Sequence, residues 1–235
     1  MMDLGMSNVA VFMPALNEEA ALPPILDSIP DWVSIVVVGD NGSSDRTAEV
    51  AAEGGARVVH EHERGYGAAC LAGIRYLASL SPPPDVLVFM DADGSDDPAD
   101  LERLVRPIID GHADMVLGVR RGVGGDVGTI LPHARLGNRL VLGLVSLVFG
   151  QSFADLPPFR AIRFSSLSTL EMDDRNWGWT LQMQIRAARM ALRVLEVDVA
   201  HRRRTEGRSK ISGSLVMSLR VGAKMFYTIA RERLR

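Results

Sequence analysis

The chain has 235 residues, of which 47% are hydrophobic and 23% charged, and this composition fits one globular domain with an ample core. Its single cysteine, Cys70, excludes an intrachain disulfide and favours a reducing compartment, so we expect a cytoplasmic protein. We expect no nucleic-acid partner. The net charge of −3 hides an asymmetry, because residues 1–119 carry 20 acidic and 6 basic side chains, whereas residues 120–235 carry 9 and 20. An acidic half can hold cations, and a basic half can hold phosphates or meet an anionic surface.

Short apolar runs alternate with helical patterns through the first half. We expect strands at Val9–Met13, Ile35–Val38, Arg57–His60, Val86–Met90 and Asp114–Gly118. The helices between them are predicted at Glu18–Ser28, Ser44–Glu53, Tyr66–Leu80 and Pro98–Asp110. The second of these helices has Ser43 or Ser44 as its candidate cap. Alternation of this kind predicts a mainly parallel sheet flanked by helices.

After Arg120 the regular alternation of strand and helix patterns ends. Four glycines between Arg121 and Thr129 indicate a loop. Helices are predicted at Pro132–Phe149, Thr180–Leu192 and Ser214–Arg233, and strands at Arg160–Phe164 and Val194–Val199. The longest apolar stretch, Leu140–Phe149, is well short of the about 20 residues that a spanning helix needs. The N-terminus lacks the basic region of a signal peptide.

Two carboxylates follow the fourth predicted strand. The apolar run Val86–Met90 stops at Asp91 and Asp93, which are one residue apart. The carboxyl ends of strands are where open α/β sheets bind ligands. Mg²⁺ typically takes one or two carboxylates together with substrate phosphates. The pair therefore indicates a metal-diphosphate site, although Asp96 and Asp97 before Pro98 could simply cap the next helix.

Polar motifs also follow the first two strands. Pro14–Glu19 follows the first strand, and Asp40–Asp45 follows the second. In a parallel sheet these segments converge with Asp91 and Asp93 on one edge. This convergence strengthens the catalytic interpretation of the aspartate pair.

Six motifs occur in the order typical of one family. They are Pro-x-x-Asn-Glu-Glu, an Asp-rich Gly-Ser turn, Gly-x-Gly-x-Ala, Asp-x-Asp, Gly-x-Arg and Arg-x-x-Gly-x-Ser-Lys, found here at Pro14–Glu19, Asp40–Asp45, Gly65–Ala69, Asp91–Asp93, Gly118–Arg120 and Arg204–Lys210. In these residues the chain resembles the inverting family 2 glycosyltransferases of the GT-A fold, and among them the dolichyl- and polyprenyl-phosphate sugar transferases. The resemblance implies a single α/β, Rossmann-like domain, with residues 1–120 as the nucleotide-sugar-binding half and residues 121–235 as the acceptor-side half.

The resemblance also implies roles for individual residues. Contacts with the nucleotide sugar are implied for Pro14, Ala15, Asn17, Glu18, Asp40, Gly67, Asp91, Arg120, Arg204, Arg208, Ser209 and Lys210. Asp91 and Asp93 would hold Mg²⁺ or Mn²⁺ on the donor diphosphate, which makes Asp93 a catalytic candidate. Lys210 is a second catalytic candidate, because a basic loop stabilises the charge that builds on the leaving nucleoside diphosphate.

Other residues keep two interpretations. These transferases often have Gln two residues after the second Asp, and here Ser95, Asp96 or water must replace it. Asp155 is the best candidate for a catalytic base, with a turn before Pro157 as the alternative. Gly65 and Gly67 fit either a helix N-terminus near phosphates or plain turn chemistry. Trp177 and Trp179, together with Gln182 and Gln184, fit an acceptor wall, with burial of the tryptophans in the core as the alternative.

We therefore expect transfer of a hexose from UDP- or GDP-hexose to an acceptor, with a polyprenyl phosphate favoured. One alternative is a small hydroxylated acceptor, and another is a non-catalytic nucleotide-sugar-binding module. A nucleotidyltransferase would have a basic phosphate loop where this chain has the acidic segment Ala15–Glu19. The apolar stripes of Leu140–Phe149 and the last helix, flanked by arginines, predict peripheral membrane contact or, alternatively, core packing or a homodimer.

Overall fold

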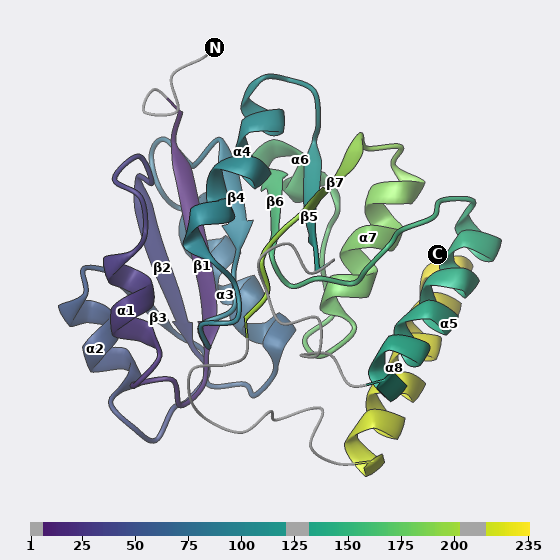
Figure 1. Cartoon of the computed structure of the whole chain (residues 1–235), viewed down its shortest axis with the longest axis horizontal. Coiled ribbons are helices and arrows are strands. Elements are labelled where there is room, and N and C mark those ends of the chain that lie inside the picture. Colours follow the sequence, from purple (N-terminus) through teal and green to yellow (C-terminus); the bar gives the residue numbers. More distant parts are fainter. Residues whose placement is uncertain (1–6, 121–131, 203–214) are drawn as a thin grey trace.

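The computed structural model describes residues 7–120, 132–202 and 215–235, with residues 132–136 and 215–219 described by their backbone alone. The described residues form one seven-stranded sheet in the order β3-β2-β1-β4-β6-β5-β7 (Figure 1). The strands are β1 (Val9–Ala15), β2 (Ile35–Asp40), β3 (Arg57–His60), β4 (Val86–Phe89), β5 (Met115–Val119), β6 (Arg160–Arg163) and β7 (Val194–Asp198). Every neighbouring pair is parallel except those of β6, which runs antiparallel to both β4 and β5.

Helices cover both faces of this sheet. They are α1 (Leu22–Asp27), α2 (Thr47–Glu53), α3 (Tyr66–Ala78), the 3₁₀ turn η2 (Pro98–Asp100), α4 (Leu101–Ile109), α5 (Pro132–Phe149), α6 (Phe164–Thr169), α7 (Trp179–Arg189) and α8 (Leu215–Leu234). In Figure 1, α5 and α8 lie side by side at the edge of the molecule beyond α7. None of the helices in the described ranges has the length and apolarity needed to cross a bilayer.

The central strands are buried on both faces, as strands between two helical layers must be. Along β1, Val9, Val11 and Met13 pack with α1, α2 and α4, whereas Ala10 and Phe12 point to the layer of α3 and α7. Their neighbour β4 is buried along its whole length. Short continuous apolar runs in the sequence predict buried strands of this type.

The expected elements in the described ranges are present, with shifted ends. The first helix starts at Leu22 and not at Glu18, because Pro23 and Pro24 have no N–H to donate to the carbonyls four residues earlier and are accommodated only in a first turn. Neither Ser43 nor Ser44 caps the second helix, which begins at Thr47. The short helix α6 was not predicted, because its six residues follow directly on β6 and extend no strong helical pattern. The predicted loop 121–129 lies outside the described residues.

Candidate active site

All seven strands have one end at the same edge of the sheet. The parallel strands β1, β2, β3, β4, β5 and β7 end there, and β6 begins there because it runs the opposite way. The register places Ala15 beside Asp40, and Arg160 between Phe89 and Leu117. The predicted convergence of motifs is therefore present, and β6 and β7 add residues to it.

The segment after β1 is tied to the segment after β2 by side-chain hydrogen bonds. Asn17 accepts from the backbone N of Ser44 through Oδ1 at 2.8 Å, and its own N donates to Ser43 Oγ at 3.0 Å. The backbone N of Glu18 donates to Thr47 Oγ1 at 2.8 Å. Ser43 and Ser44 therefore hold the loop of the predicted nucleotide pocket instead of capping a helix.

Asp40 is buried at the end of β2 with both carboxylate oxygens engaged. Its Oδ1 accepts from the backbone N of Ser43 at 3.0 Å, and its Oδ2 lies 3.1 Å from His60 Nδ1. Burial by itself raises the pKa of Asp40, but the hydrogen bonds from Ser43 and His60 outweigh it, so the pKa lies below its usual value. Asp40 is thus an ionised acceptor, as a contact to the N–H of a base or to a ribose hydroxyl requires.

The two glycines at the start of α3 have a packing reason. A Cβ on Gly67 would lie 2.0 Å from the carbonyl oxygen of Asp174, and one on Gly65 would lie 2.1 Å from that of Arg175. The backbone N of Ala68 donates to the same Arg175 carbonyl at 2.9 Å. Close approach of segment 174–175 therefore requires these glycines, and the role of Gly67 in nucleotide binding stays a prediction.

The turn after β4 holds the aspartate pair in a fixed shape. The backbone N of Ser95 donates to Asp93 Oδ1 at 2.9 Å, and the backbone N of Asp91 donates to Asp96 Oδ2 at 3.0 Å. Asp93, Ser95 and Asp96 are all buried. Asp96 therefore organises the turn with one of its oxygens. Asp97 accepts from the backbone N of Ala99, and so caps η2 as the alternative interpretation expected.

His201 is a candidate site residue that sequence reasoning missed. It forms an isolated antiparallel bridge with Asp96, and its Nδ1 lies 3.8 Å from Asp96 Oδ1. That nitrogen is buried and makes no hydrogen bond with any described residue. The available signal was a histidine just beyond the predicted strand Val194–Val199, at the same sheet edge as the aspartates.

The donor set suits a divalent cation that is completed by substrate oxygens. Asp91 and Asp93 supply carboxylates, and the unsatisfied nitrogen of His201 lies beside their turn. Within the described ranges, however, no three acidic, histidine or cysteine side chains are already clustered as a finished metal site. A cation bound here would need oxygens from a diphosphate, which is usual for Mg²⁺.

Arg120 and Asp155 form a bidentate ion pair at the end of β5. Arg120 Nε donates to Asp155 Oδ2 at 2.7 Å, and its Nη2 donates to Oδ1 at 2.8 Å. Burial alone would raise the pKa of Asp155, but the contacts with Arg120 and the backbone N of Leu156 hold it below its usual value. A carboxylate with this environment is a poor proton acceptor, so the predicted role of Asp155 as base is disfavoured by its geometry.

Of the predicted acceptor wall, the structure buries Trp179, Gln182 and Gln184, and the role of Trp177 stays a prediction. Trp179 is fully buried and meets the ring of Phe89 edge to face, with 6.2 Å between ring centroids. It therefore belongs to the core. Trp177 is half-buried. The predicted phosphate ligands Arg204, Arg208, Ser209 and Lys210 lie outside the described residues.

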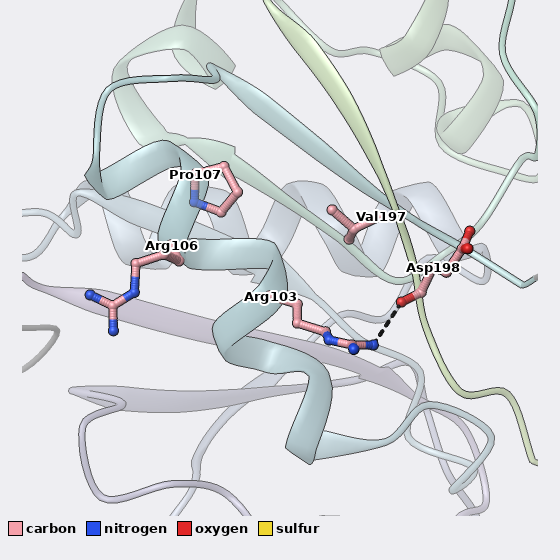
Figure 2. A pocket seen from close by; sticks show the side chains of 5 residues that line it. All are labelled: Arg103, Arg106, Pro107, Val197 and Asp198. Carbon is pink, nitrogen blue, oxygen red and sulfur yellow. Dashed lines mark hydrogen bonds between the residues drawn. The ribbon is translucent and has the colours of Figure 1, made fainter. Parts of the chain in front are cut away.

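A cavity of about 480 Å³ lies elsewhere, between α4 and β7 (Figure 2). Its lining contains none of the predicted site residues and consists of Arg103, Arg106, Pro107, Val197 and Asp198. Arg103 is already engaged, because it donates to the Asp198 carbonyl at 3.1 Å and pairs with Asp100 at 3.3 Å. We therefore place the chemistry at the sheet edge and not in this cavity.

Sequence comparison gives the family. The profile described as Glycosyl transferase family 2 matches residues 10–193. An uncharacterized glycosyltransferase of Mycobacterium tuberculosis is 42% identical, over 88% of this chain and 91% of its own length. The undecaprenyl-phosphate mannosyltransferase of Micrococcus luteus is 32% identical, over 88% of this chain and 89% of its own length.

Structure comparison gives the fold. Glucosyl-3-phosphoglycerate synthase from Mycobacterium tuberculosis, solved with Mn²⁺, UDP-glucose and phosphoglyceric acid, superposes with a TM-score of 0.76 at 24% identity, covering 99% of this chain and 84% of that one. The match spans both halves of the sheet, and it confirms the predicted Rossmann-like GT-A architecture.

Proposed function

The chain belongs to glycosyltransferase family 2, and we propose that it transfers a hexose from a UDP- or GDP-sugar to a polyprenyl phosphate with inversion of the anomeric carbon. The observation that carries the proposal is the meeting, at one sheet edge, of the Asp91–Asp93 turn with the Arg120–Asp155 pair. The first suits a metal-bound diphosphate, and the second adds a fixed cation beside it. The named function of the Micrococcus luteus relative supports a lipid-phosphate acceptor.

The reaction is a direct displacement. An oxygen of the acceptor phosphate attacks the anomeric carbon from the side opposite the nucleotide. The bond from that carbon to the diphosphate oxygen breaks, and its electron pair leaves with the nucleoside diphosphate. A phosphate oxygen is already anionic, so no base has to remove a proton. This agrees with the environment of Asp155, because both of its carboxylate oxygens accept hydrogen bonds from the Arg120 guanidinium.

The metal-binding residues in this proposal are Asp91 and Asp93, with His201 as a third candidate. When bound, a divalent cation neutralises the charge that builds on the leaving diphosphate. Asp96 holds the backbone of Asp91, so the turn is organised before the ligand arrives. Mn²⁺ in the complex of the mycobacterial synthase with UDP-glucose supports a divalent cation, and we include Mg²⁺ as the second candidate.

Arg120 was predicted to contact the nucleotide sugar, and we propose instead that it meets the acceptor. Burial alone would lower the pKa of Arg120, but the ion pair with Asp155, and after it the charges of Asp96 and Asp91, hold this pKa above its usual value. Its guanidinium therefore stays charged within reach of the metal turn, where an incoming phosphate would meet it. Arg204, Arg208, Ser209 and Lys210 remain predicted ligands of the donor phosphates.

A lipid acceptor requires the protein to reach a membrane surface, and α5 with α8 offers a suitable one. Large apolar side chains are exposed on both helices, namely Leu140 and Leu147 on α5 and Phe226, Tyr227 and Leu234 on α8. Leu147 is 82% exposed and Leu234 is 88% exposed. Arg231, Arg233 and Arg235 lie at the end of α8, where Arg231 and Arg235 also pair with Asp173, at 2.6 Å and 2.8 Å. We propose peripheral contact through this surface, since basic residues near an anionic leaflet each contribute about 1 kcal/mol.

A direct transfer assay tests the proposal. Purified protein is incubated with a panel of UDP- and GDP-hexoses carrying a labelled sugar, undecaprenyl phosphate in detergent, and Mn²⁺ or Mg²⁺. We expect label in a lipid-extractable product that is absent when EDTA is added, and opposite anomeric configurations in donor and product by NMR. Parallel reactions contain 3-phosphoglycerate or glycerol in place of the lipid.

Each outcome separates the candidate functions. Transfer to a soluble hydroxyl acceptor alone would replace the lipid-phosphate proposal with the small-acceptor alternative. Nucleotide-sugar binding without transfer to any acceptor, and without slow donor hydrolysis, would favour the non-catalytic binding module. Retention of configuration would contradict the single displacement.

A further inference from the structure

Arg160 is an arginine buried inside the protein, at the start of β6. Only 1% of it is exposed, and the register places it between Phe89 and Leu117, directly below the edge that bears Asp91 and Arg120. Its guanidinium donates to the Pro157 carbonyl through Nε at 3.0 Å and again through Nη2, and to the Thr180 carbonyl through Nη1 at 3.0 Å. Placing a charged group here is costly, because a buried cation loses its hydration.

Gln184 of α7 completes this arrangement. Its Oε1 accepts from Arg160 Nη2 at 3.3 Å, and its Nε2 donates to the Asp155 carbonyl at 3.1 Å. Gln184 is fully buried, so these contacts use the amide inside the core. Arg160 and Gln184 thus fasten both ends of the segment 155–157 to the first turns of α7.

That segment carries Asp155, the partner of Arg120. Its backbone is held by Gln184 at residue 155 and by Arg160 at residue 157, while its carboxylate binds Arg120 bidentately. A chain of contacts therefore runs from α7, through Gln184 and Arg160, to the cation beside the metal turn. A buried polar network whose groups are hydrogen-bonded rigidifies the segments that it joins.

We propose that Arg160 and Gln184 are positioning residues that set the location of the Arg120 guanidinium through Asp155. This positioning role depends on the proposed function in one respect, namely that the substrate bound by Arg120 is the acceptor phosphate. Neither residue touches substrate. Their contribution is to keep the segment 155–157 in one conformation, so that Arg120 is oriented before the acceptor binds and little is lost in ordering it.

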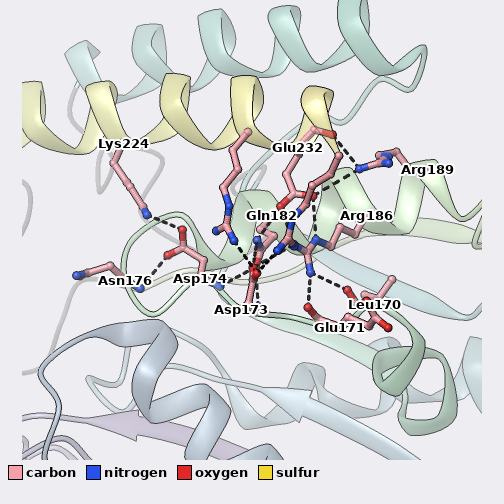
Figure 3. Close-up of polar contacts among 12 residues, drawn as sticks. Leu170, Glu171, Asp173, Asp174, Asn176, Gln182, Arg186, Arg189, Lys224 and Glu232 are labelled. Atoms are coloured by element: carbon pink, nitrogen blue, oxygen red, sulfur yellow. Dashed lines mark hydrogen bonds and ion pairs between the residues drawn. The ribbon is translucent and has the colours of Figure 1, made fainter.

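The competing explanation is that the network only stabilises the core, and α7 supplies a matched control. Gln182 lies two positions before Gln184 on α7 and is as deeply buried. Its side chain makes its hydrogen bonds on the opposite side of the helix. Its Oε1 accepts from the backbone N of Asp173 and Asp174, and its Nε2 donates to Asp173 and Glu232 (Figure 3). Loss of that amide removes buried hydrogen bonds without affecting the segment 155–157.

The experiment compares Gln184→Met with Gln182→Met, because methionine keeps the length of the side chain and removes its hydrogen bonds. The first readout is the Nε–H signal of Arg120 in ¹⁵N–¹H spectra, assigned with Arg120→Lys. Arg120 Nε lies 2.7 Å from Asp155 Oδ2, so its hydrogen-bonded proton is expected to exchange slowly with solvent. We expect Gln184→Met to shift this signal and speed its exchange at least tenfold, whereas Gln182→Met leaves it in place although both variants lower Tm.

The second readout is kinetic and uses undecaprenyl phosphate with the active donor. We expect Gln184→Met to raise the KM for the lipid phosphate by about five- to tenfold, the scale of one buried hydrogen bond, with little change in the KM for the donor. In an Asp155→Asn background the same substitution should have almost no further effect, because residues that act through one another are not additive.

The outcomes are distinguishable from failure of the proposed function. An altered Arg120 signal without lipid transfer would retain the positioning role and reject the acceptor. An unchanged Arg120 signal in Gln184→Met would overturn the positioning role, whatever the activity. Equal effects of Gln184→Met and Gln182→Met on both readouts, or additivity with Asp155→Asn, would show that the network serves stability alone.

Discussion

His60 and Asp40 occupy paired positions on adjacent parallel strands, and the imidazole Nδ1 lies 3.1 Å from the carboxylate Oδ2. The histidine side chain is largely exposed, whereas the aspartate is buried. An exposed residue therefore helps to fix the orientation of a buried acceptor at the predicted nucleotide pocket. Glu61 extends the same contact, since its backbone N donates to the Asp40 carbonyl at 2.9 Å.

Replacing His60 should weaken nucleotide binding. His60→Ala removes one hydrogen-bond donor from Asp40, so its pKa should rise and the carboxylate should become more mobile. We expect the Kd for UDP or GDP in calorimetry to increase by about three- to tenfold, the scale of one modest hydrogen bond. His60→Gln keeps a donor and serves as the control, and equal affinity of His60→Ala and the wild type would contradict the role.

The aspartate pair makes a sharper prediction. Asp93→Asn should abolish the part of nucleotide affinity that depends on Mn²⁺, while the fold is retained because the residue lies beyond the end of β4. Calorimetry with UDP or GDP, with Mn²⁺ and with EDTA, measures the difference. Asp97→Asn is the control in the same turn, since Asp97 caps η2. Nucleotide binding that neither EDTA nor Asp93→Asn changes would remove the metal role.

Arg120 should be intolerant of lysine. Lysine keeps the charge but cannot bind both oxygens of Asp155 at once. We expect Arg120→Lys to lower kcat/KM for the lipid phosphate by roughly two orders of magnitude, the scale of losing one oriented charge-stabilising donor. Donor affinity is measured in parallel, and an equal loss of donor and acceptor binding would assign Arg120 to the nucleotide instead.

The same ion pair should make stability fall in acid. The pKa of Asp155 is lowered in the folded protein, so the ionised carboxylate stabilises the fold above its unfolded pKa of about 3.9. This contribution is lost as pH falls from that value through the lower folded pKa. Asp155→Asn should therefore show a smaller loss of Tm between pH 5 and pH 3 than the wild type, in calorimetry at matched ionic strength.

Membrane contact is tested by one substitution on each exposed helix. Leu147→Asp on α5 and Phe226→Asp on α8 should each reduce co-sedimentation with anionic vesicles at low salt. Leu195→Asp on the edge strand β7 is the control, because Leu195 is also exposed but lies on another surface. If the wild type does not pellet with these vesicles, the proposed contact is wrong, and a dimer through α5 and α8 becomes the explanation to test by light scattering.

The sequence predicted the meeting of the aspartates at one sheet edge but not the pairing of Arg120 with Asp155. Asp40, Asp91 and Asp93 follow short apolar strands, and a parallel sheet brings such positions to one edge. The pairing of Asp155 with Arg120 spans 35 residues and depends on β6 running antiparallel between β4 and β5, which no local pattern indicates. His201 was missed for the same reason, because its neighbours come from a distant segment.

The antiparallel strand β6 also determines when the sheet can close during synthesis. Residues 160–163 fill the gap between β4 and β5, although they follow both in the chain. A nascent chain that ends before Arg160 has β4 as an open edge, and β5 has no partner on either side, since β7 comes later still. Open apolar edges invite pairing with other chains. Until residues 160–163 are available, the apolar edges of β4 and β5 that β6 later covers therefore stay unpaired.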